Sequence, residues 1–262
     1  MTNMFLENNS VSNPSINIVI PMAGEGSRFK KAGFEKPKPF IDVMGKPMVK
    51  WVMENLHVPD AHYILISRKE HIAAESDLVA SIEKEFSVTI ITVDQLTEGT
   101  ACTVLFSREY INNDTPLLIA NSDQWVEFSL EDMLRDAKQN NWDGSILTFI
   151  DKEMNPKWSF AKTNEKSEVV EVKEKVAISD KATVGIYYFS KGRYFVDAAV
   201  DMIVHNERVN NEFYTCPVYN WALKNNLLIG IYDIPPVAMH GLGTPEDLKL
   251  FLSWFNLHSS KA

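Results

Sequence analysis

The sequence predicts an α/β fold: one Rossmann-like domain with a mostly parallel sheet, helices on both of its faces, and a small β-rich insertion in the C-terminal half. Two observations lead to this class. Apolar runs typical of buried strands alternate with helical stretches over the first 150 residues, and this order is typical of parallel sheets covered on both faces. The length of 262 residues also fits one large domain.

The expected strands are short runs rich in apolar or β-branched residues. The run 88–93, for example, reads Val-Thr-Ile-Ile-Thr-Val and favours a strand for that reason. The stretch 158–175 alternates and is interrupted at 164–167, which predicts a hairpin inside the insertion. Outside the hairpin, the expected strands in chain order are 16–21, 62–67, 87–94, 116–120, 145–150, 182–190 and 227–234.

The expected helices follow from the helical spacing of apolar residues and from capping residues. Ser129 is a good N-cap, and Thr244 is another, because Pro245 and two acidic residues follow it. In chain order, the expected helices are 47–56, 72–86, 100–110, 130–139, 194–205, 218–224 and 245 to about 257.

Composition excludes several classes of protein. The net charge of −9 argues against nucleic acid as a partner, since proteins that bind a duplex are usually basic. No apolar stretch approaches the roughly 18–20 residues that a membrane span needs, so we expect no membrane partner. Cys102 and Cys216 have neither metal-ligand spacing nor the density of a disulfide framework. They fit buried thiols in a reducing compartment, and we expect a cytoplasmic protein.

The first fifteen residues differ from the rest. They are rich in Asn and Ser and have neither the basic nor the apolar region of a secretory signal. We expect residues 1–15 to form a disordered extension, with a strap over the first strand as the alternative, and residues 16–262 to form the functional domain.

A glycine-containing loop follows the first expected strand. Gly24 and Gly26 come directly after the apolar run 16–21, so bare backbone N–H groups are expected at the end of that strand. Such groups cradle phosphate oxygens, although a plain tight turn has the same pattern. Arg28 adds a forked cation suited to polyphosphate. A dinucleotide fingerprint would need a third glycine where this chain has Phe29.

A second cationic loop follows. Lys36 and Lys38 flank Pro37, and Pro39 comes next, so the prolines hold two positive charges in a rigid backbone. Either the loop is simply solvated, or an anion binds there. We expect Lys38 to be the cation that meets a nucleotide.

Asp123 follows the apolar run 117–120 directly after Asn121 and Ser122. A carboxylate at the C-terminal end of a parallel strand lies in the crevice where open α/β sheets bind ligands. Next to phosphates its expected work is to hold Mg²⁺. The alternative is a helix N-cap, but Ser129 already caps the next helix.

The run 95–101 joins a strand to a helix. Gly99 leaves room for a flat ring, and the Gln95 amide offers a donor and an acceptor to the edge of a base. We expect Gln95, Gly99 and Thr100 to bind the nucleotide, with an ordinary strand-to-helix turn as the alternative.

Together these residues resemble the nucleotidyltransferase superfamily of sugar-1-phosphate pyrophosphorylases, such as the glucose-1-phosphate thymidylyltransferases. The resemblance runs from Ile16 to about Phe255. Its opening motif A-G-x-G-(S/T)-R appears as Ala23-Gly24-Glu25-Gly26-Ser27-Arg28, and its P-K-P-(L/F) appears as Pro37-Lys38-Pro39-Phe40. Its G-D is similar to Ser122-Asp123, its E-K to Glu174-Lys175, and its late D-x-G-T to Gly241-Leu242-Gly243-Thr244.

The resemblance implies a role for each matching position. Arg28 and Lys38 would bind the triphosphate, with Ala23, Gly24, Gly26 and Ser27 forming the nucleotide loop. Asp123 would hold Mg²⁺. Lys175 would bind the phosphate of the acceptor and Glu174 the rest of it, which makes residues 151–192 the acceptor-binding insertion. Where the family often has a second metal-binding Asp, this chain has Gly241, with His240 beside it either as a substitute ligand or as a structural residue.

The resemblance therefore implies an enzyme that joins a nucleoside triphosphate to a phosphorylated sugar or other small phosphomonoester and releases pyrophosphate. A pyrimidine nucleotide, CTP first, is expected because small cytidylyltransferases share this length. The runs 121–124, 210–214 and 241–248 resemble a branch linked to capsule or surface-polysaccharide synthesis. Two alternatives stay open: a nucleotide-sugar glycosyltransferase and a non-catalytic nucleotide-binding regulator. The aromatic residues Phe251, Trp254 and Phe255 fit either a core or the seam of a homodimer.

Overall fold

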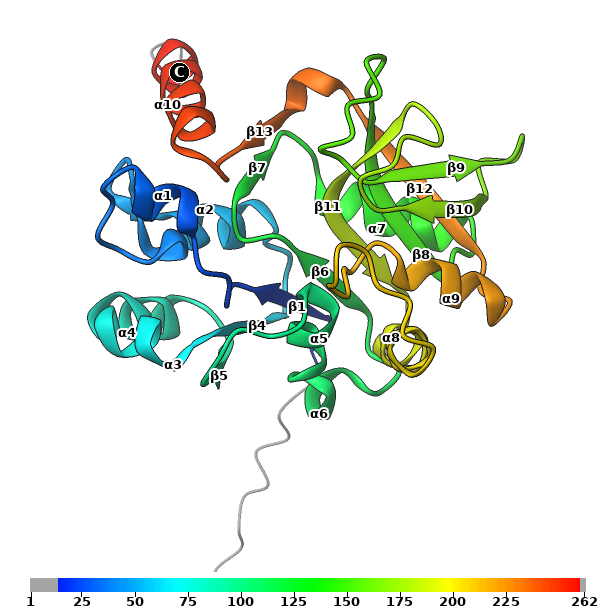
Figure 1. The fold of residues 1–262 in the computed structure, drawn as a ribbon, viewed down its shortest axis with the longest axis horizontal. Coiled ribbons are helices and arrows are strands. Elements are labelled where there is room, and N and C mark those ends of the chain that lie inside the picture. Colours follow the sequence, from blue (N-terminus) through cyan, green and yellow to red (C-terminus); the bar gives the residue numbers. More distant parts are fainter. Residues whose placement is uncertain (1–13, 260–262) are drawn as a thin grey trace, which may run out of the picture.

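The apolar run at the start of the chain forms β1, Ile16–Pro21, which lies inside the main sheet (Figure 1). The structure is a computed structural model that describes residues 14–259. Most of the expected N-terminal extension, residues 1–13, therefore lies outside the described residues. At the start of the described chain, the Ser15 amide donates to the carbonyl of Asp60 (3.1 Å).

The remaining elements agree with most of the expected ones. The strands are β2 Asp42–Val43, β3 Lys46–Pro47, β4 Ala61–Arg68, β5 Val88–Val93, β6 Leu117–Ala120, β7 Gln124–Val126, β8 Gly144–Ile150, β9 Phe160–Thr163, β10 Val169–Lys173, β11 Lys181–Phe189, β12 Ile229–Ile234 and β13 Met239–Gly241. The α-helices are α1 Ser27–Lys31, α2 Met48–Asn55, α3 Lys69–Ala74, α4 Ser76–Glu85, α5 Thr100–Leu105, α6 Arg108–Ile111, α7 Leu130–Gln139, α8 Gly192–Val204, α9 Val218–Lys224 and α10 Pro245–Ser259. Two 3-10 helices, η1 Lys38–Phe40 and η2 Pro236–Ala238, complete the described chain.

Two expected helices are interrupted. The stretch 100–110 was expected to be one helix but divides into α5 and α6 around Ser107, whose buried hydroxyl donates to the Val104 carbonyl (2.6 Å). Such a local side-chain bond competes with helical hydrogen bonds. The stretch 72–86 divides into α3 and α4 at Glu75, where φ is −123°.

The sheet confirms the expected α/β class. Over the described residues, nine strands form the main sheet, in the order β10-β9-β11-β6-β1-β4-β5, with β8 paired to β11 and β12 paired to β8. Strands β6, β1, β4 and β5 run parallel, and β12 runs parallel to β8. Strand β11 runs antiparallel to β6 and β8, because the chain returns from the insertion in the opposite direction. Of the described residues, none belongs to a helix long and apolar enough to cross a membrane.

Helices cover both faces of the sheet (Figure 1). Ile18 and Ile20 of β1 pack in one apolar cluster with α2, α4 and α7, whereas Val19 packs in another with α5, α8 and α9. This alternation is what period-2 side chains in a doubly covered strand require. A third cluster joins α1, α2 and α10 through Phe29, Trp51 and Phe251.

The C-terminal aromatic residues make internal contacts. The ring centroid of Phe251 lies 5.7 Å from that of Trp51, and Trp254 lies 4.1 Å from His240. Phe251 is buried. These contacts support the core interpretation of α10, while a homodimer stays a prediction.

The hairpin β9–β10 is held to the body of the protein by Asn220 on α9. The Asn220 amide oxygen accepts from the Val172 amide, and its nitrogen donates to the Val172 carbonyl, both at 2.9 Å. Val172 is fully buried, so no water would replace these bonds.

We expect Asn220→Ala to lower the free energy of unfolding by about 2 kcal/mol, because it leaves two buried backbone groups without partners. Urea denaturation measures this value. The matched control is Asn140→Ala at the exposed end of α7, which should change stability by less than about 0.5 kcal/mol. Equal losses in the two variants would contradict the anchoring role.

Candidate active site

Two loops meet at one edge of the sheet because β1 and β6 are parallel. Their register pairs Asn17 with Leu117 and Val19 with Ile119, so both strands end on the same side. A cavity of about 230 Å³ lies there. It is lined by Pro21, Met22, Gly24, Lys38, Pro39, Thr100, Asn121, Ser122 and Asp123. The structure thus brings together four residues selected from the sequence: Gly24, Lys38, Thr100 and Asp123.

Lys38 and Asp123 form an ion pair across this cavity. The distance from Lys38 Nζ to Asp123 Oδ2 is 2.7 Å, and the two side chains are 22% and 24% exposed. Gly26 supports Lys38 closely: its φ is +62°, and a Cβ added there would lie 3.1 Å from the Lys38 Cβ. Lys36 lies elsewhere, 3.3 Å from Glu75 Oε2.

A second glycine, Gly243, leaves room for the carboxylate of Asp123. A Cβ added at Gly243 would lie only 2.8 Å from Asp123 Oδ2, and the Leu242 amide donates to the Asp123 carbonyl (2.7 Å). Within residues 14–259, no group of three or more His, Cys, Asp or Glu side chains could hold a metal alone. One carboxylate still fits Mg²⁺, since this ion is commonly held by one or two carboxylates together with substrate phosphates and water.

His240 has other partners. Its Nε2 lies 2.9 Å from Glu127 Oε1, and its ring lies against Trp125 and Trp254. These contacts favour the structural interpretation of His240. The carboxylate near Gly241 belongs to Asp247, whose Cγ would lie 3.4 Å from an added Cβ at Gly241.

Several residues selected from the sequence do not line the cavity. Ala23 is buried beneath it, while Ser27, Arg28 and Gln95 are exposed and Gly26 is half-buried. Gly99 has a φ of +121°, and a Cβ there would lie 2.4 Å from the carbonyl oxygen of Phe213. Gly99 therefore makes room for the protein's own backbone, and its expected contact with a base stays a prediction.

Glu174 and Lys175 follow the hairpin. Lys175 has a φ of +56°, and its Nζ donates to the Tyr214 hydroxyl (2.8 Å) while lying 4.4 Å from the Tyr214 ring centroid. Glu174 accepts a hydrogen bond from Ser159. Burial raises the pKa of Glu174, although Ser159 and the charge of Lys175 act in the opposite direction.

Sequence reasoning missed several residues of this region. Gly185 (φ +90°) accommodates Asn121, since an added Cβ would lie 2.2 Å from the Asn121 amide nitrogen. Ser159 and Tyr214 hold Glu174 and Lys175. The only available signals were that Asn121 lies two positions before Asp123 and that Tyr214 closes an unusual Asn-rich run.

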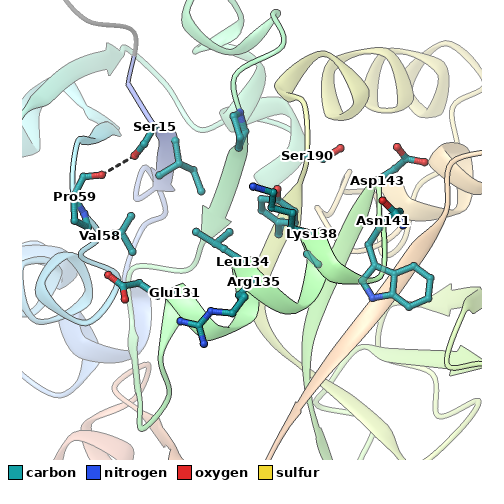
Figure 2. Close-up of a pocket in the computed structure, with 15 residues that line it drawn as sticks. Ser15, Val58, Pro59, Glu131, Leu134, Arg135, Lys138, Asn141, Asp143 and Ser190 are labelled. Atoms are coloured by element: carbon teal, nitrogen blue, oxygen red, sulfur yellow. Dashed lines mark hydrogen bonds between the residues drawn. The ribbon is translucent and has the colours of Figure 1, made fainter.

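A larger cavity, about 680 Å³, lies at the amino ends of β1 and β6 (Figure 2). Figure 2 shows Glu131, Arg135 and Lys138 of α7 along it, with the Ser15 hydroxyl donating to the Pro59 carbonyl (2.7 Å). It contains none of the residues selected from the sequence. We therefore place the candidate active site in the smaller cavity, where a loop glycine, a cation and a carboxylate converge.

Comparison with known proteins identifies the family of this chain. The model of the family described as "Nucleotidyl transferase" matches residues 18–219, most of the chain. The chain belongs to the nucleotidyl transferase family. The matched range includes both cavity loops and the Glu174-Lys175 pair.

Among curated proteins, this member of the family is similar to the mannose-1-phosphate guanylyltransferase catalytic subunit beta of Dictyostelium discoideum. The two are 23% identical over 175 residues, which is 66% of this chain and 49% of that protein. A mannose-1-phosphate guanylyltransferase of Arabidopsis thaliana is 27% identical over 180 residues, 64% and 48% of the two chains. The chain spans about half the length of the curated relatives it matches.

Among solved structures, the nucleoside-diphosphate-sugar pyrophosphorylase from Vibrio cholerae RC9 is similar over 90% of this chain and 99% of its own, with a TM-score of 0.78 and 25% identity. The inositol-1-phosphate CTP transferase from T. maritima is similar over 92% and 96% of the two chains, with a TM-score of 0.71 and 14% identity. The second likeness shows the fold alone.

The raised pKa of Glu174 predicts a measurable effect on stability. Because the folded protein holds the proton on Glu174 more tightly than the unfolded chain, this group costs stability as the pH rises through its folded pKa. We expect Glu174→Gln to raise the melting temperature at pH 8, because the variant carries no charge that burial disfavours. The gain should shrink as the pH falls through the folded pKa of Glu174, because the wild-type carboxyl then takes up its proton.

Thermal melts from pH 5 to pH 8 test this, with Glu165→Gln in the exposed hairpin turn as the control. A Glu174→Gln variant that is less stable than the wild type throughout this range would show that the buried carboxylate stabilises the fold.

Proposed function

We propose that this protein is a nucleotidyltransferase that joins a nucleoside triphosphate to a phosphorylated small molecule and releases pyrophosphate. The observation that carries the proposal is the meeting of Lys38 and Asp123, 2.7 Å apart, beside Gly24 in one cavity of a nucleotidyl transferase family member. A cation and a potential metal ligand at the same edge of the sheet would together neutralise the negative charge of two phosphorylated substrates.

The chemical problem is repulsion between anions. The acceptor phosphate must approach the α-phosphorus of the triphosphate, and one pair of like charges about 4 Å apart costs roughly 4 kcal/mol at an effective dielectric of 20. Lys38 and Arg28 would neutralise the triphosphate and stabilise the departing pyrophosphate. Lys175 would hold the acceptor phosphate in line with the bond that breaks.

The acceptor phosphate oxygen forms the new bond to the α-phosphorus as the bond to pyrophosphate breaks. No covalent enzyme intermediate is required. A general base is also unnecessary, because a phosphate dianion is already nucleophilic near neutral pH. Mg²⁺ bound through Asp123 would supply further charge neutralisation. To reach the triphosphate, Lys38 must exchange its bond to Asp123 for one to phosphate.

The nucleotide and acceptor belong to the same proposal. Gln95, Gly99 and Thr100 would contact the base, with CTP as the favoured nucleotide. The acceptor would be a sugar phosphate or another phosphomonoester, and the product would serve capsule or surface-polysaccharide synthesis. The named relatives include guanylyl and CTP transferases, so the base must be tested directly.

The decisive experiment is a matrix of the four ribonucleoside triphosphates and dTTP against phosphorylated sugars, phosphocholine and other phosphomonoesters, with pyrophosphate detection. We expect release that requires both substrates and Mg²⁺. Transfer of sugar from a nucleotide sugar without pyrophosphate release would favour a glycosyltransferase. Nucleotide binding without turnover over the whole matrix would favour a regulator.

Lys175→Ala should lower kcat/KM for the acceptor at least about 100-fold, because a buried phosphate would lose its charged partner. The Kd of the nucleoside triphosphate, from calorimetry, should stay within about twofold. Lys166→Ala in the exposed hairpin turn is the control. Equal losses in acceptor turnover and nucleotide affinity would contradict the acceptor role of Lys175.

Gly243→Ala tests the metal role of Asp123. The added methyl group would displace the carboxylate oxygen 2.8 Å away. We expect an approximately tenfold weaker Mn²⁺ affinity in the presence of nucleotide and a matching rise in the Mg²⁺ requirement. Gly241→Ala is a close control, because its added Cβ meets Asp247 at an ordinary 3.4 Å. If the two variants bind Mn²⁺ alike, Asp123 is not the metal ligand.

A further inference from the structure

One short segment, residues 212–215, contacts both halves of the candidate active site. On the nucleotide side, the Phe213 amide donates to the Glu98 carbonyl (2.7 Å), and the Phe213 carbonyl accepts from the Ala101 amide (2.9 Å). The Thr215 amide and hydroxyl both donate to Thr100 Oγ, at 3.1 and 3.0 Å. Thr100 itself lines the cavity beside Lys38 and Asp123.

The residue between these two, Tyr214, contacts the acceptor side. Its hydroxyl accepts from Lys175 Nζ (2.8 Å), and its ring lies under the same ammonium group (4.4 Å). Within the described part of the chain, no carboxylate lies within 4.0 Å of the Lys175 ammonium group, so its direct contacts are with Tyr214, while the charge of Glu174 acts from farther away. A hydrogen bond and a cation–π contact from one residue restrict the long lysine side chain.

The segment has little freedom to move independently of the nucleotide loop, residues 98–101. Phe213 is buried, and its backbone is so close to Gly99 that a Cβ there would lie 2.4 Å from the Phe213 carbonyl oxygen. Arg208 adds a bond to Glu98 (2.6 Å) and lies 4.1 Å from the Phe213 ring centroid. A shift of the nucleotide loop would therefore move Phe213 and Thr215, the two neighbours of Tyr214.

We propose that Tyr214 is a positioning residue for Lys175, and that the segment 212–215 couples the position of Lys175 to the occupancy of the nucleotide loop. Nucleotide bound against Thr100 favours one arrangement of Thr215 and Tyr214, and this arrangement directs the Lys175 ammonium group toward the acceptor phosphate. The inference rests on the proposed function for the identity of the acceptor. Because the coupling is thermodynamic, acceptor phosphate must in turn strengthen nucleotide binding.

Two variants separate the two parts of this proposal. Tyr214→Phe keeps the ring and removes the hydroxyl, while Thr215→Val keeps the shape and removes the bond to Thr100 Oγ. Tyr110→Phe is the matched control, since Tyr110 lies on α6 with its ring near His62. All variants are studied in the full chain, with melting temperatures to confirm folding.

The first readout is independent of turnover. Acetic anhydride labels lysine amines, and mass spectrometry of the peptide that contains Lys175 gives its labelling rate with and without CTP and the other nucleoside triphosphates. In the wild type we expect the tightest-binding nucleotide to change this rate. Tyr214→Phe should raise the rate without nucleotide about threefold to tenfold, the effect of one lost hydrogen bond. Thr215→Val should leave that rate unchanged but remove the response to nucleotide.

The second readout uses the best acceptor from the substrate matrix. Tyr214→Phe should raise the acceptor KM about tenfold, with the Kd of the nucleotide within about twofold of the wild type. Unchanged Lys175 labelling and acceptor KM in Tyr214→Phe would overturn the positioning role, as would an equal loss of nucleotide affinity. A wild-type labelling rate that ignores every nucleotide that binds would overturn the coupling. If no substrate pair reacts, the proposed function fails, while the labelling comparison still decides the role of Tyr214.

Discussion

The parallel pairing of β1 with β6 is the constraint on which the candidate active site depends. Because the two strands share a direction and a register, the loops that follow Pro21 and Ala120 leave the sheet at one edge. The segment after β1 supplies Gly24 and, beyond α1, Lys38 at the start of η1, whereas the loop after β6 supplies Asp123. An antiparallel pairing would send these loops to opposite ends of the sheet, so no local rearrangement of side chains could bring the cation and the carboxylate together. The helices on both faces matter to the site mainly because they bury β1 and keep this register fixed.

The charge balance inside the cavity differs from that of the whole chain. The chain carries a net charge of −9, yet the cavity at the sheet edge balances Asp123 with Lys38. The pair keeps the free cavity close to neutral and spares either charge from partial burial alone. Under the proposed function, binding of polyphosphate and metal would be an exchange of partners: phosphate would replace Asp123 on Lys38, and the metal would replace Lys38 on Asp123. Such an exchange would link the affinities for nucleotide and metal, since each ligand would release the group that the other requires.

The sequence was sufficient for features that depend on near neighbours along the chain. Most strands and helices were predicted. Gly24, Lys38, Thr100 and Asp123 were each expected to contact the nucleotide or its metal, and they line one cavity. For Gly24 and Asp123 this follows because the ends of neighbouring parallel strands share an edge. The rest depends on contacts between distant segments. Gly185 and Gly243 matter because Asn121 and Asp123 approach them, and Tyr214 matters because Lys175 lies 39 positions away in sequence but bonds its hydroxyl. The pairing of the three-residue strands β7 and β13 was missed because neither is long enough to show a period.

The two proposed sides of the site differ in which residues carry unfavourable backbone angles or buried charges. On the proposed nucleotide side, positive φ angles fall on Gly26 and Gly99, where such angles cost little. On the proposed acceptor side, Lys175 has a left-handed φ despite its full side chain. Glu174 beside it is a half-buried carboxylate, and burial raises its pKa. Residues in such unfavourable conformations are found where the surrounding structure holds them in place. Here the hairpin anchor at Asn220, the Ser159 hydroxyl and the Tyr214 hydroxyl provide that support. A phosphate arriving at Lys175 would meet an ammonium group already desolvated on one side, so less of its binding energy would go into ordering the lysine.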